Sequence, residues 1–392
     1  MHKIVFTEEF CQPENLHPFT LTRQIQDIRV GILTIREKWE RWLGLTSFDK
    51  WEDDYKDLDR SIRIDKKIGN DVFLMIHGNV LPTAKMVKAI SKLSNGEFIS
   101  VNGNAGIVFR FTKKEMVEPY KIKVKKAVTI KDKIKALQFP WEIFQWNDEA
   151  IREDYGLITA QRKSHQISKT NKAIKASQIF IEKGAKVECS VLNASTGPIY
   201  IGKNAEVMEG CLIRGPFALG EGSVLKMGSK VYGATSIGPF CAVAGEIKNS
   251  VIFGYSNKAH DGYLGDSVIG EWCNLGAGTS NSNLKNNASE VKIWTPKGEV
   301  VAGNKCGVLM GDYSRAAINT SFNTGTVVGS CCNVVGAGLT PKHLPSFSWG
   351  NDGIDRYDFE KAVSDIQNWK KLKGKKLSAN EKTILKYIFE HY

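Results

Sequence analysis

The feature that most constrains this chain is a six-residue period that begins at Ile201. From Ile201 to Lys248 the sequence divides into eight consecutive blocks of six, and every block opens on Ile, Val or Leu. Neither an isolated helix nor an alternating strand repeats every six residues. Short strands wound into a three-sided coil do repeat in this way, with the recurring aliphatic side chain pointing inward. The period therefore predicts a parallel β-helix of hexapeptide repeats.

The period is interrupted once and then resumes. Asn249 and Ser250 break the phase, after which the blocks open on Val251, Asn257, Tyr263, Ile269 and Leu275. A third run follows an irregular insertion and extends from Met310 to Leu339. An irregular edge on a solenoid can present polar groups beside a rigid face. We therefore expect a functional site where the phase breaks.

Before the coil, the sequence predicts an α/β, Rossmann-like domain. Lys3 to Thr7 and Val72 to His77 are expected to be strands, and Ile35 to Leu43 a helix. Gly78-Asn79 ends the second strand, and Thr83 is placed to cap a following helix. Strand, glycine turn and helix form the βα unit of a parallel sheet.

We expect three parts in the chain. Residues 1–165 should form the α/β domain, with a helix from Pro140 to Thr159 near its end, and residues 178–340 the β-helix domain. Residues 341–392 should form a helical cap over the end of the coil, because a solenoid needs its last apolar turn covered. Ser378 and Glu381 have the spacing of a capping box at the start of the last helix.

Composition restricts the partners and the location. The net charge of +12 suits polyanionic small molecules such as sugar phosphates and coenzyme A. The lysines between Thr112 and Ala136 lack the interleaved aromatic residues of RNA-binding modules, so we expect a solvated face and no nucleic-acid partner. No apolar run is long enough to span a membrane, and the start MHKIVFTEEF lacks the apolar core of a signal peptide. We expect a cytoplasmic protein with no membrane partner.

The eight cysteines include no C-x-x-C pair, and several occupy positions for small apolar residues within the hexads. They are therefore expected to be reduced packing residues. Adjacent Cys331 and Cys332 leave a soft-metal site as an alternative, although neighbouring residues of a strand face opposite sides.

The run EIKNSVIFGYSNKAHDGYLGD, from Glu246 to Asp266, resembles the acetyltransferase half of the GlmU family, and the similarity continues through SVIGEWCNLGAGTSNSNL. GlmU proteins are bifunctional N-acetylglucosamine-1-phosphate uridylyltransferases and glucosamine-1-phosphate acetyltransferases. The segments LHPFTLTR, DIRVGILTIREKWE, NASTGPIY and PSFSWG resemble the variant GlmU-like sugar nucleotidyltransferases of Bacteroidetes. The resemblance implies that residues 1–165 are a nucleotidyltransferase-like domain and that residues 178–340 are an acyltransferase domain. It also implies that the β-helix is left-handed and forms a homotrimer that binds acetyl-CoA between neighbouring coils.

His260 is the candidate catalytic residue, and it is the one histidine between residues 166 and 342. An amino sugar must lose a proton to attack a thioester, and imidazole, with a pKa of about 6.5, suits that task. A lone histidine is more often a packed or surface residue. The match of K-A-H-x-x-Y-L-G-D to the family favours a general base here.

The resemblance also implies a set of binding residues. Lys248, Tyr263, Asn274 and Asn283 match family residues around the amino sugar and its phosphate, although asparagine and tyrosine can also simply cover a β-helix corner. Ala277, in LGAGT, matches the residue whose backbone N–H faces the thioester oxygen, and a tight corner is the plain alternative.

Two positively charged residues expected from the family resemblance are missing from this sequence. The arginine expected after IGPF is absent, and Arg214 or Lys230 are its possible substitutes. The lysine expected a few residues beyond Asn283 falls near Ser289, with Lys285 and Lys292 nearby. These departures leave the identity of the acceptor sugar open.

The N-terminal domain departs further from sugar nucleotidyltransferases. Their glycine-rich loop, whose amides cradle a triphosphate, is absent after the first strand, and the metal-binding Asp appears as Asn79. Arg23 and Asp27 could still bind phosphate or metal, and a structural pair is an equal alternative. Mg²⁺ would be needed only if nucleotidyl transfer is retained.

The sequence thus favours an acetyl-CoA-dependent N-acetyltransferase acting on an amino-sugar 1-phosphate of the glucosamine-1-phosphate type, with no metal in that reaction. A mono- or bifunctional sugar-1-phosphate nucleotidylyltransferase and a non-catalytic sugar-nucleotide-binding scaffold are the alternatives. A zinc carbonic anhydrase on the same coil would need three histidine ligands, and the coil offers one.

Overall fold

The computed structural model describes residues 2–8, 11–47, 71–103, 106–118 and 121–392. Residues 9–10, which follow the first strand, and 119–120, in the lysine-rich segment, lie outside this description. Contacts divide the chain into two compact units. The first comprises residues 1–13, 23–28 and 33–138, and the second comprises 14–22, 29–32 and 139–392.

The first unit is built on a five-stranded sheet in the order β1-β2-β4-β3-β7. Its strands are β1 (His2–Thr7), β2 (Val72–His77), β3 (Glu97–Val101), β4 (Gly106–Phe111) and β7 (Lys126–Ile130). The pairs β1/β2 and β3/β7 are parallel, whereas β4 runs antiparallel to both of its neighbours. The two predicted strands are confirmed, but the sheet is mixed because β4 inserts between the two parallel pairs.

The helices of this unit begin where the sequence predicts. Helix α1 (Ile35–Leu43) has a capping box between Thr34 and Glu37, and α2 (Ala84–Ile90) is capped by the Thr83 side chain. The smaller elements are η2 (Ile25–Asp27), β5 (Met116–Glu118) and β6 (Lys121–Ile122). Trp39 of α1 is buried, and its Nε1 donates to the Val80 carbonyl at 2.7 Å.

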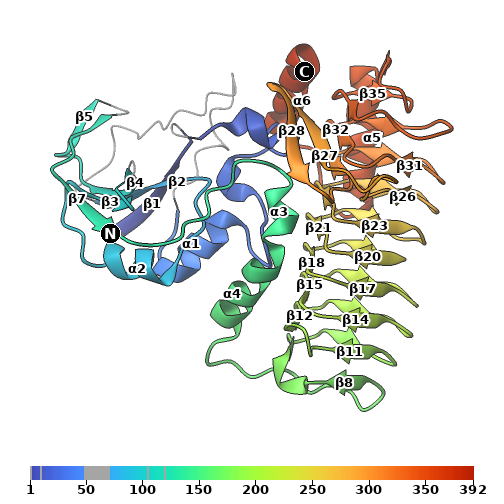
Figure 1. The fold of residues 1–392 in the computed structure, drawn as a ribbon, viewed down its shortest axis with the longest axis horizontal. Helices are drawn as coiled ribbons and strands as arrows, with labels where there is room; N and C mark the ends of the chain where they lie inside the picture. Colours follow the sequence, from blue (N-terminus) through green and yellow to red (C-terminus); the bar gives the residue numbers. More distant parts are fainter. Residues whose placement is uncertain (1, 9–10, 48–70, 104–105, 119–120) are drawn as a thin grey trace. The chain divides into compact units, whose positions relative to one another are not determined.

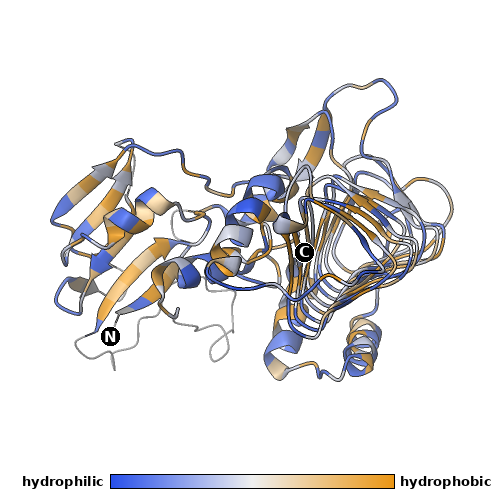
Figure 2. Ribbon diagram, turned by 90° about the horizontal axis from the view of Figure 1, so that it is seen from below, coloured by the Kyte–Doolittle hydropathy of each residue, from blue (hydrophilic) through white to orange (hydrophobic). Residues whose placement is uncertain are grey.

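The second unit contains a left-handed β-helix whose coils wind around three faces (Figures 1 and 2). The six-stranded face consists of β8 (Lys172–Ile174), β11 (Val191–Asn193), β14 (Leu212–Arg214), β17 (Lys230–Tyr232), β20 (Glu246–Lys248) and β23 (Tyr263–Gly265). The ten-stranded face consists of β10 (Lys186–Val187), β13 (Glu206–Val207), β16 (Val224–Leu225), β19 (Ala242–Val243), β22 (Asn257–Lys258), β25 (Asn274–Leu275), β30 (Arg315–Ala316), β33 (Asn333–Val334), β35 (Ser348–Trp349) and the antiparallel β36 (Asp355–Arg356).

The nine-stranded face completes the triangle. Its strands are β9 (Ile179–Ile181), β12 (Ile199–Ile201), β15 (Phe217–Leu219), β18 (Thr235–Ile237), β21 (Val251–Ile252), β24 (Val268–Ile269), β29 (Leu309–Met310), β32 (Val327–Val328) and β34 (His343–Leu344). The pair β26 (Ser280–Asn281) and β31 (Ser321–Phe322) extends the coil, and the hairpin of β27 (Val291–Thr295) and β28 (Gly298–Gly303) is the irregular insertion.

The inward positions confirm most of the predicted phase. All eight block openers from Ile201 to Val243 are buried in one apolar core, as are the five of the run that starts at Met310. The next inward side chains after Val243 are Ile247, Ile252, Lys258, Leu264, Ile269 and Leu275. The blocks predicted to open on Val251, Asn257 and Tyr263 are therefore one residue out of phase, because the sides of the coil between Val243 and Ile252 are shorter than six residues. This correction puts a lysine at an inward position.

Along one corner of the coil, a column of residues adopts the left-handed backbone conformation, and most of these residues are aromatic. Its members, with φ between 58° and 63°, are Phe240, Tyr255, Trp272, Tyr313, Cys331 and Phe347. Helices α5 (Phe359–Leu372) and α6 (Ala379–His391) pack on this column, and the predicted capping box of Ser378 and Glu381 is confirmed. Beyond α5, Lys373 Nζ donates to the Phe240 carbonyl at 2.6 Å. The helices thus run beside several coils instead of only covering the last one.

The segment predicted as one helix from Pro140 to Thr159 forms two, α3 (Glu142–Gln145) and α4 (Asn147–Thr159). Helix α4 belongs to the second unit, and the Asn147 side chain connects it to other parts of that unit. Asn147 Oδ1 accepts from Gly31 N at 3.0 Å, and Asn147 Nδ2 donates to the Ala234 carbonyl at 2.7 Å. The predicted boundary near residue 165 lies beyond these helices. No helix within the described residues is long and apolar enough to cross a membrane.

The two short 3-10 helices of the second unit are η1 (Pro13–Leu16), which continues past the unit boundary, and η3 (Ala176–Gln178). Cys332 points into the coil core, whereas Cys331 packs against the C-terminal helices. The two thiols therefore lie on opposite sides of the wall, and this arrangement does not form a shared soft-metal site.

Candidate functional site

The candidate site lies at the corner between the ten-stranded and six-stranded faces. Because Asn257 pairs with Asn274, residues 260 and 277 occupy the same corner on successive coils. At this corner, Gly278 N donates to the Asp261 carbonyl at 3.0 Å. The structure thus brings His260 and Ala277 together.

The Ala277 backbone is held in place from the next coil. Its carbonyl accepts from Asn319 N at 2.7 Å, whereas its own N–H has no acceptor among the described residues. A Cβ atom on the preceding Gly276 would lie 2.5 Å from Ile318 N, so the close approach of the coils requires glycine there. An unpaired N–H at an exposed corner can donate to a ligand.

His260 is exposed, and its imidazole has no hydrogen-bond partner in the described part of the chain. Beneath it, Lys258 is 2% exposed inside the coil. Lys258 Nζ donates to the carbonyls of His260 at 2.9 Å and of Ala244 at 3.3 Å. Burial lowers the pKa of Lys258 to about 8. Sequence reasoning missed this residue, because the phase it assigned to the second run placed Lys258 outside.

Asn283 and Tyr263 meet on the six-stranded side of this corner. Asn283 Nδ2 donates to Tyr263 Oη at 3.2 Å and also to the Asp266 carboxylate. Asp266 is 4% exposed, and its other oxygen accepts from Asn249 Nδ2 at 2.7 Å. Asp266 therefore orients Asn283, a role that sequence reasoning did not assign although Asp266 belongs to the YLGD motif.

Lys248 lies next to Tyr263 on the same face. Lys248 pairs with Gly265, and a Cβ at Gly265 would lie 2.2 Å from Tyr263 Oη. The Tyr263 ring therefore folds over Gly265, which places its hydroxyl near Lys248. Burial raises the pKa of Tyr263, and the charges of Asp266 and Glu246 raise it further.

Asn274 does not join this cluster. It stands on the ten-stranded face, in the column between Asn257 and Arg315. The C-terminal helical region contacts both neighbours, since Lys373 Nζ donates to Asn257 Oδ1 at 3.0 Å and the Arg315 guanidinium lies 5.5 Å from the centre of the Trp369 ring. The structure thus separates Asn274 from Tyr263 and Asn283.

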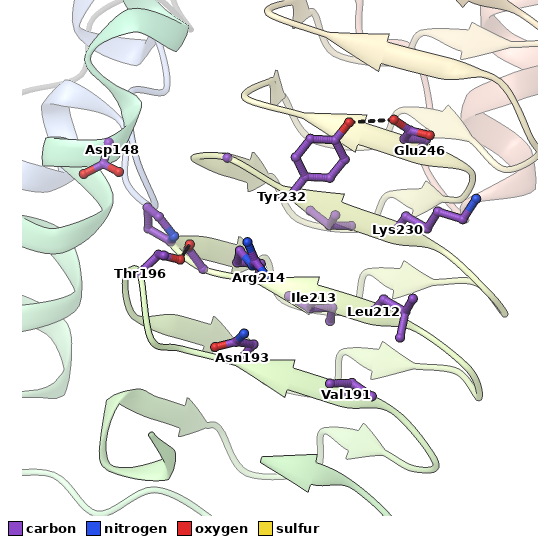
Figure 3. Close-up of a pocket in the computed structure, with 14 residues that line it drawn as sticks. Asp148, Val191, Asn193, Thr196, Leu212, Ile213, Arg214, Lys230, Tyr232 and Glu246 are labelled. Carbon is purple, nitrogen blue, oxygen red and sulfur yellow. Dashed lines mark hydrogen bonds between the residues drawn. The ribbon is translucent and has the colours of Figure 1, made fainter. Parts of the chain in front are cut away.

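A pocket of about 660 Å³ extends along the six-stranded face from the Glu246 end (Figure 3). Both possible substitutes for the missing arginine line it, Arg214 and Lys230. Of the candidates for the missing lysine, Lys285 donates to the Glu290 carbonyl at 2.5 Å, and Lys292 is exposed on β27.

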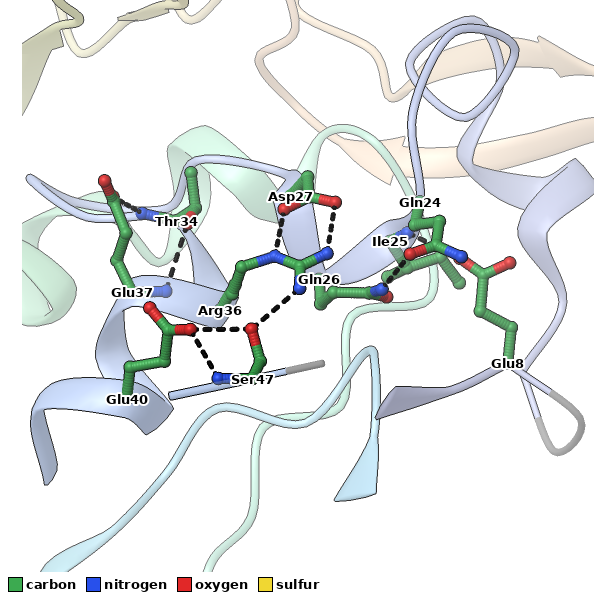
Figure 4. Close-up of polar contacts among 10 residues, drawn as sticks. All are labelled: Glu8, Gln24, Ile25, Gln26, Asp27, Thr34, Arg36, Glu37, Glu40 and Ser47. Atoms are coloured by element: carbon green, nitrogen blue, oxygen red, sulfur yellow. Dashed lines mark hydrogen bonds and ion pairs between the residues drawn. The ribbon is translucent and has the colours of Figure 1, made fainter. Parts of the chain in front are cut away.

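Of the N-terminal candidates, Asp27 takes part in a network of structural contacts (Figure 4). Asp27 accepts two hydrogen bonds from Arg36, at 2.6 and 2.9 Å, and Arg36 Nη1 also donates to Ser47 Oγ at 2.8 Å. Arg23 is buried. Asn79 is 3% exposed and forms two hydrogen bonds with Leu137. Asn79 Nδ2 donates to the Leu137 carbonyl at 3.2 Å, and Leu137 N donates to the Asn79 carbonyl at 2.7 Å.

These residues do not fit Mg²⁺. Mg²⁺ prefers carboxylate oxygens, whereas Asn79 is neutral and the Asp27 carboxylate is neutralised by a guanidinium. Within the described ranges, His, Cys, Asp and Glu form no group of three or more that could hold a metal ion.

The chain is similar to a known protein family and to several known proteins. Residues 4–163 match the sequence model of a sugar nucleotidyl transferase family. The chain is 36% identical over 107 residues to the bifunctional protein GlmU of Methanocaldococcus jannaschii. The matched segment covers 27% of this chain and 26% of that relative. The chain is 26% identical over 169 residues to the uncharacterized acetyltransferase YaiX of Escherichia coli O6:K15:H31, covering 40% of this chain and 69% of the relative.

Among solved structures, the polySia-specific acetyltransferase NeuO matches with a TM-score of 0.28 and 12% identity, over 53% of this chain and 99% of NeuO. The match to the archaeal GlmU spans about a quarter of that protein's length. The chain thus combines a region at residues 4–163 that matches the sugar nucleotidyl transferase family with a left-handed β-helix, and about a quarter of it is similar in sequence to a GlmU protein.

Proposed function

We propose that the β-helix transfers an acetyl group from acetyl-CoA to the amine of an amino-sugar phosphate. The observation that carries this proposal is the position of His260 beside Ala277 on successive coils of one exposed corner. A general base and an unpaired N–H donor are the two groups that acyl transfer from a thioester needs. The names of the GlmU and acetyltransferase relatives agree with this chemistry.

In the proposed reaction, the His260 imidazole accepts a proton from the sugar amine as the nitrogen attacks the thioester carbon. A C–N bond forms, and the Ala277 N–H donates to the oxyanion of the tetrahedral intermediate. Collapse of the intermediate breaks the C–S bond. The proton returns from the imidazolium to the departing thiolate, so the products are the N-acetylated sugar phosphate and free coenzyme A.

The neighbouring residues provide the contacts that such substrates need. Lys248 offers a cation for the sugar phosphate, and Asn283, held by Asp266, faces the sugar. On the coil after Ala277, the corner is occupied by Ile318, which is 68% exposed and can cover the apolar part of the pantetheine arm. We further propose a homotrimer with acetyl-CoA bound between neighbouring coils, and acetyl-CoA as donor implies a cytoplasmic enzyme.

The test is release of coenzyme A thiol from acetyl-CoA by the purified full chain, across glucosamine-1-phosphate, galactosamine-1-phosphate and nucleotide-linked amino sugars. His260→Ala should abolish release, whereas His165→Ala, an exposed histidine outside this corner, should leave it unchanged. No release with any acceptor would contradict the proposal, and tight ligand binding without turnover would indicate a non-catalytic scaffold.

Sugar-1-phosphate nucleotidyl transfer is the second candidate, because residues 4–163 match a sugar nucleotidyl transferase family. The burial of Asn79, which is 3% exposed, and the pairing of the Asp27 carboxylate with Arg36 oppose it. Release of pyrophosphate from nucleoside triphosphates in the presence of sugar-1-phosphates would support this activity. His260→Ala should not change it.

A further inference from the structure

The six-stranded face carries cations beyond the candidate acceptor site. Its register aligns Arg214, Tyr232 and Lys248 in one outward column, with one residue from each successive coil. The neighbouring column holds Lys230, Glu246 and Tyr263 in the same order. Adjacent strands lie about 4.8 Å apart, so Tyr263 and Arg214 are separated by about 14 Å along the coil. A sugar monophosphate bound at Tyr263 is too short to reach Arg214.

The charge available on this part of the face is positive. Arg214 and Lys230 are exposed, and neither has an ion-pair partner among the residues described. The two carboxylates in the pocket are already engaged, because Glu246 accepts from Tyr232 Oη at 2.6 Å and Asp148 pairs with Arg152 at 2.6 Å. The hydrogen bond to Glu246 raises the pKa of Tyr232 to about 12. The Tyr232 hydroxyl leaves the charge of Glu246 in place, so an anion entering the pocket meets this one carboxylate and the two cations Arg214 and Lys230, which outnumber it.

The shape of the pocket suits an extended ligand. It is lined by four successive strands, β11, β14, β17 and β20, which together span about 14 Å. Asp148 and Thr196 border one side of it (Figure 3). By strand register, Tyr232 lies on the coil between those of Arg214 and Lys248. Its hydroxyl is directed at Glu246 (Figure 3), and its ring offers a flat surface for stacking.

We propose that the acceptor is a nucleoside diphosphate amino sugar. Its amine lies near His260 and Asn283, its first phosphate near Lys248 and its second near Arg214 and Lys230, with the nucleoside along the pocket. The placement of the amine rests on the proposed acetyl transfer. The anion subsite at Arg214 and Lys230 rests only on the pocket and its charges.

The test is isothermal titration calorimetry of the full chain, without acetyl-CoA, using UDP, GDP, UMP and glucosamine-1-phosphate as probes. A nucleoside diphosphate should bind at least about tenfold more tightly than either monophosphate, since a charge-assisted hydrogen bond is gained. Arg214→Gln and Lys230→Gln should each weaken diphosphate binding about tenfold, and Arg214→Lys should weaken it less. Lys186→Gln, at an exposed lysine of the ten-stranded face, should have no effect.

Equal affinity for monophosphates and diphosphates would overturn this inference, as would unchanged diphosphate binding in a folded Arg214→Gln protein. The two proposals fail separately. Coenzyme A release with glucosamine-1-phosphate at a rate equal to that with a UDP-linked amino sugar keeps acetyl transfer and rejects the longer acceptor. Arg214-dependent binding of diphosphates without any coenzyme A release keeps the subsite and rejects acetyl transfer.

Discussion

Inside the coil, the ammonium group of Lys258 donates to the backbone carbonyl of His260 at 2.9 Å. Lys258 occupies a position where the other inward side chains of its run are aliphatic. A buried cation with hydrogen bonds only to carbonyls is costly in an apolar core, so the fold retains it at the expense of stability. Its position two residues before His260 fixes the chain at the candidate active corner.

Replacement of Lys258 by Met should change how stability depends on pH. Burial lowers the pKa of Lys258 from 10.5 to about 8. Between these two values the unfolded chain binds a proton that the folded chain does not, so the free energy of unfolding of the wild type rises with pH. Relative to Lys258→Met, this gain should total about 3 kcal/mol. Guanidinium unfolding at pH 7 to 10.5 measures it, with Lys186→Met as the exposed control, and parallel curves for wild type and Lys258→Met would contradict the prediction.

Asp266→Asn should impair the acceptor site while the fold is kept. The substitution removes the carboxylate that accepts from both Asn249 and Asn283, so Asn283 loses its fixed orientation. Loss of a hydrogen bond to a charged group should lower kcat/KM for the acceptor by about tenfold or more. Steady-state kinetics provide the measurement, and Asp355→Asn on the exposed strand β36 is the control. Similar losses in the two variants would rule out the orienting role.

Lys370→Met should loosen the C-terminal helices from the coil. Lys370 is 5% exposed, pairs with Glu381 and lies 4.9 Å from the centre of the Trp272 ring. Its removal leaves Glu381, which also accepts from Tyr313 Oη at 3.1 Å, without its cation. The expected loss is about 3 kcal/mol. Limited proteolysis should cut Lys370→Met between α5 and α6 faster than Lys371→Met, which removes an exposed neighbour; equal rates would show that the pair does not hold the helices.

Arg36→Met should destabilise the first unit and should not act through a nucleotide. The Arg36 side chain is largely buried and holds Asp27 and Ser47 by charge-assisted hydrogen bonds. We expect a loss of about 2 kcal/mol in thermal or denaturant unfolding, against almost none for the exposed Arg41→Met on the same helix. Nucleoside triphosphates with Mg²⁺ should not stabilise the first unit of the wild type; protection that depends on Asp27 would reverse the assignment of this pair.

The sequence predicts those parts of the fold that depend on local patterns. Thr34, Thr83 and Ser378 cap their helices because capping needs only a side-chain oxygen and a free N–H a few residues away. The hexapeptide phase is correct wherever each side of the coil has six residues. It fails around Lys258 because two sides are shorter, and side length is set by how the whole coil closes.

The candidate site shows the same limit. His260 and Ala277 are recognisable from a motif, yet their positions on one corner follow from strand register, which links residues 17 positions apart. The sequence placed Asn274 with Tyr263 and Asn283, although it lies on another face. The sequence also could not show that Asp27 pairs with Arg36. The same local sequence is compatible with an Asp27 that binds a ligand and with one that forms a structural ion pair.

On the six-stranded face, the regular register relates the number of coils between two outward residues to the distance between those residues. Each complete coil between two outward residues separates them by one further strand spacing, about 4.8 Å, while their direction stays the same. Removal of the one coil that lies between those of Arg214 and Lys248 would therefore shorten the gap between these cations by that amount and leave the corner of His260 unaltered. The number of coils between two binding residues therefore sets the distance between them. Related proteins could select acceptors of different length by the gain or loss of whole coils.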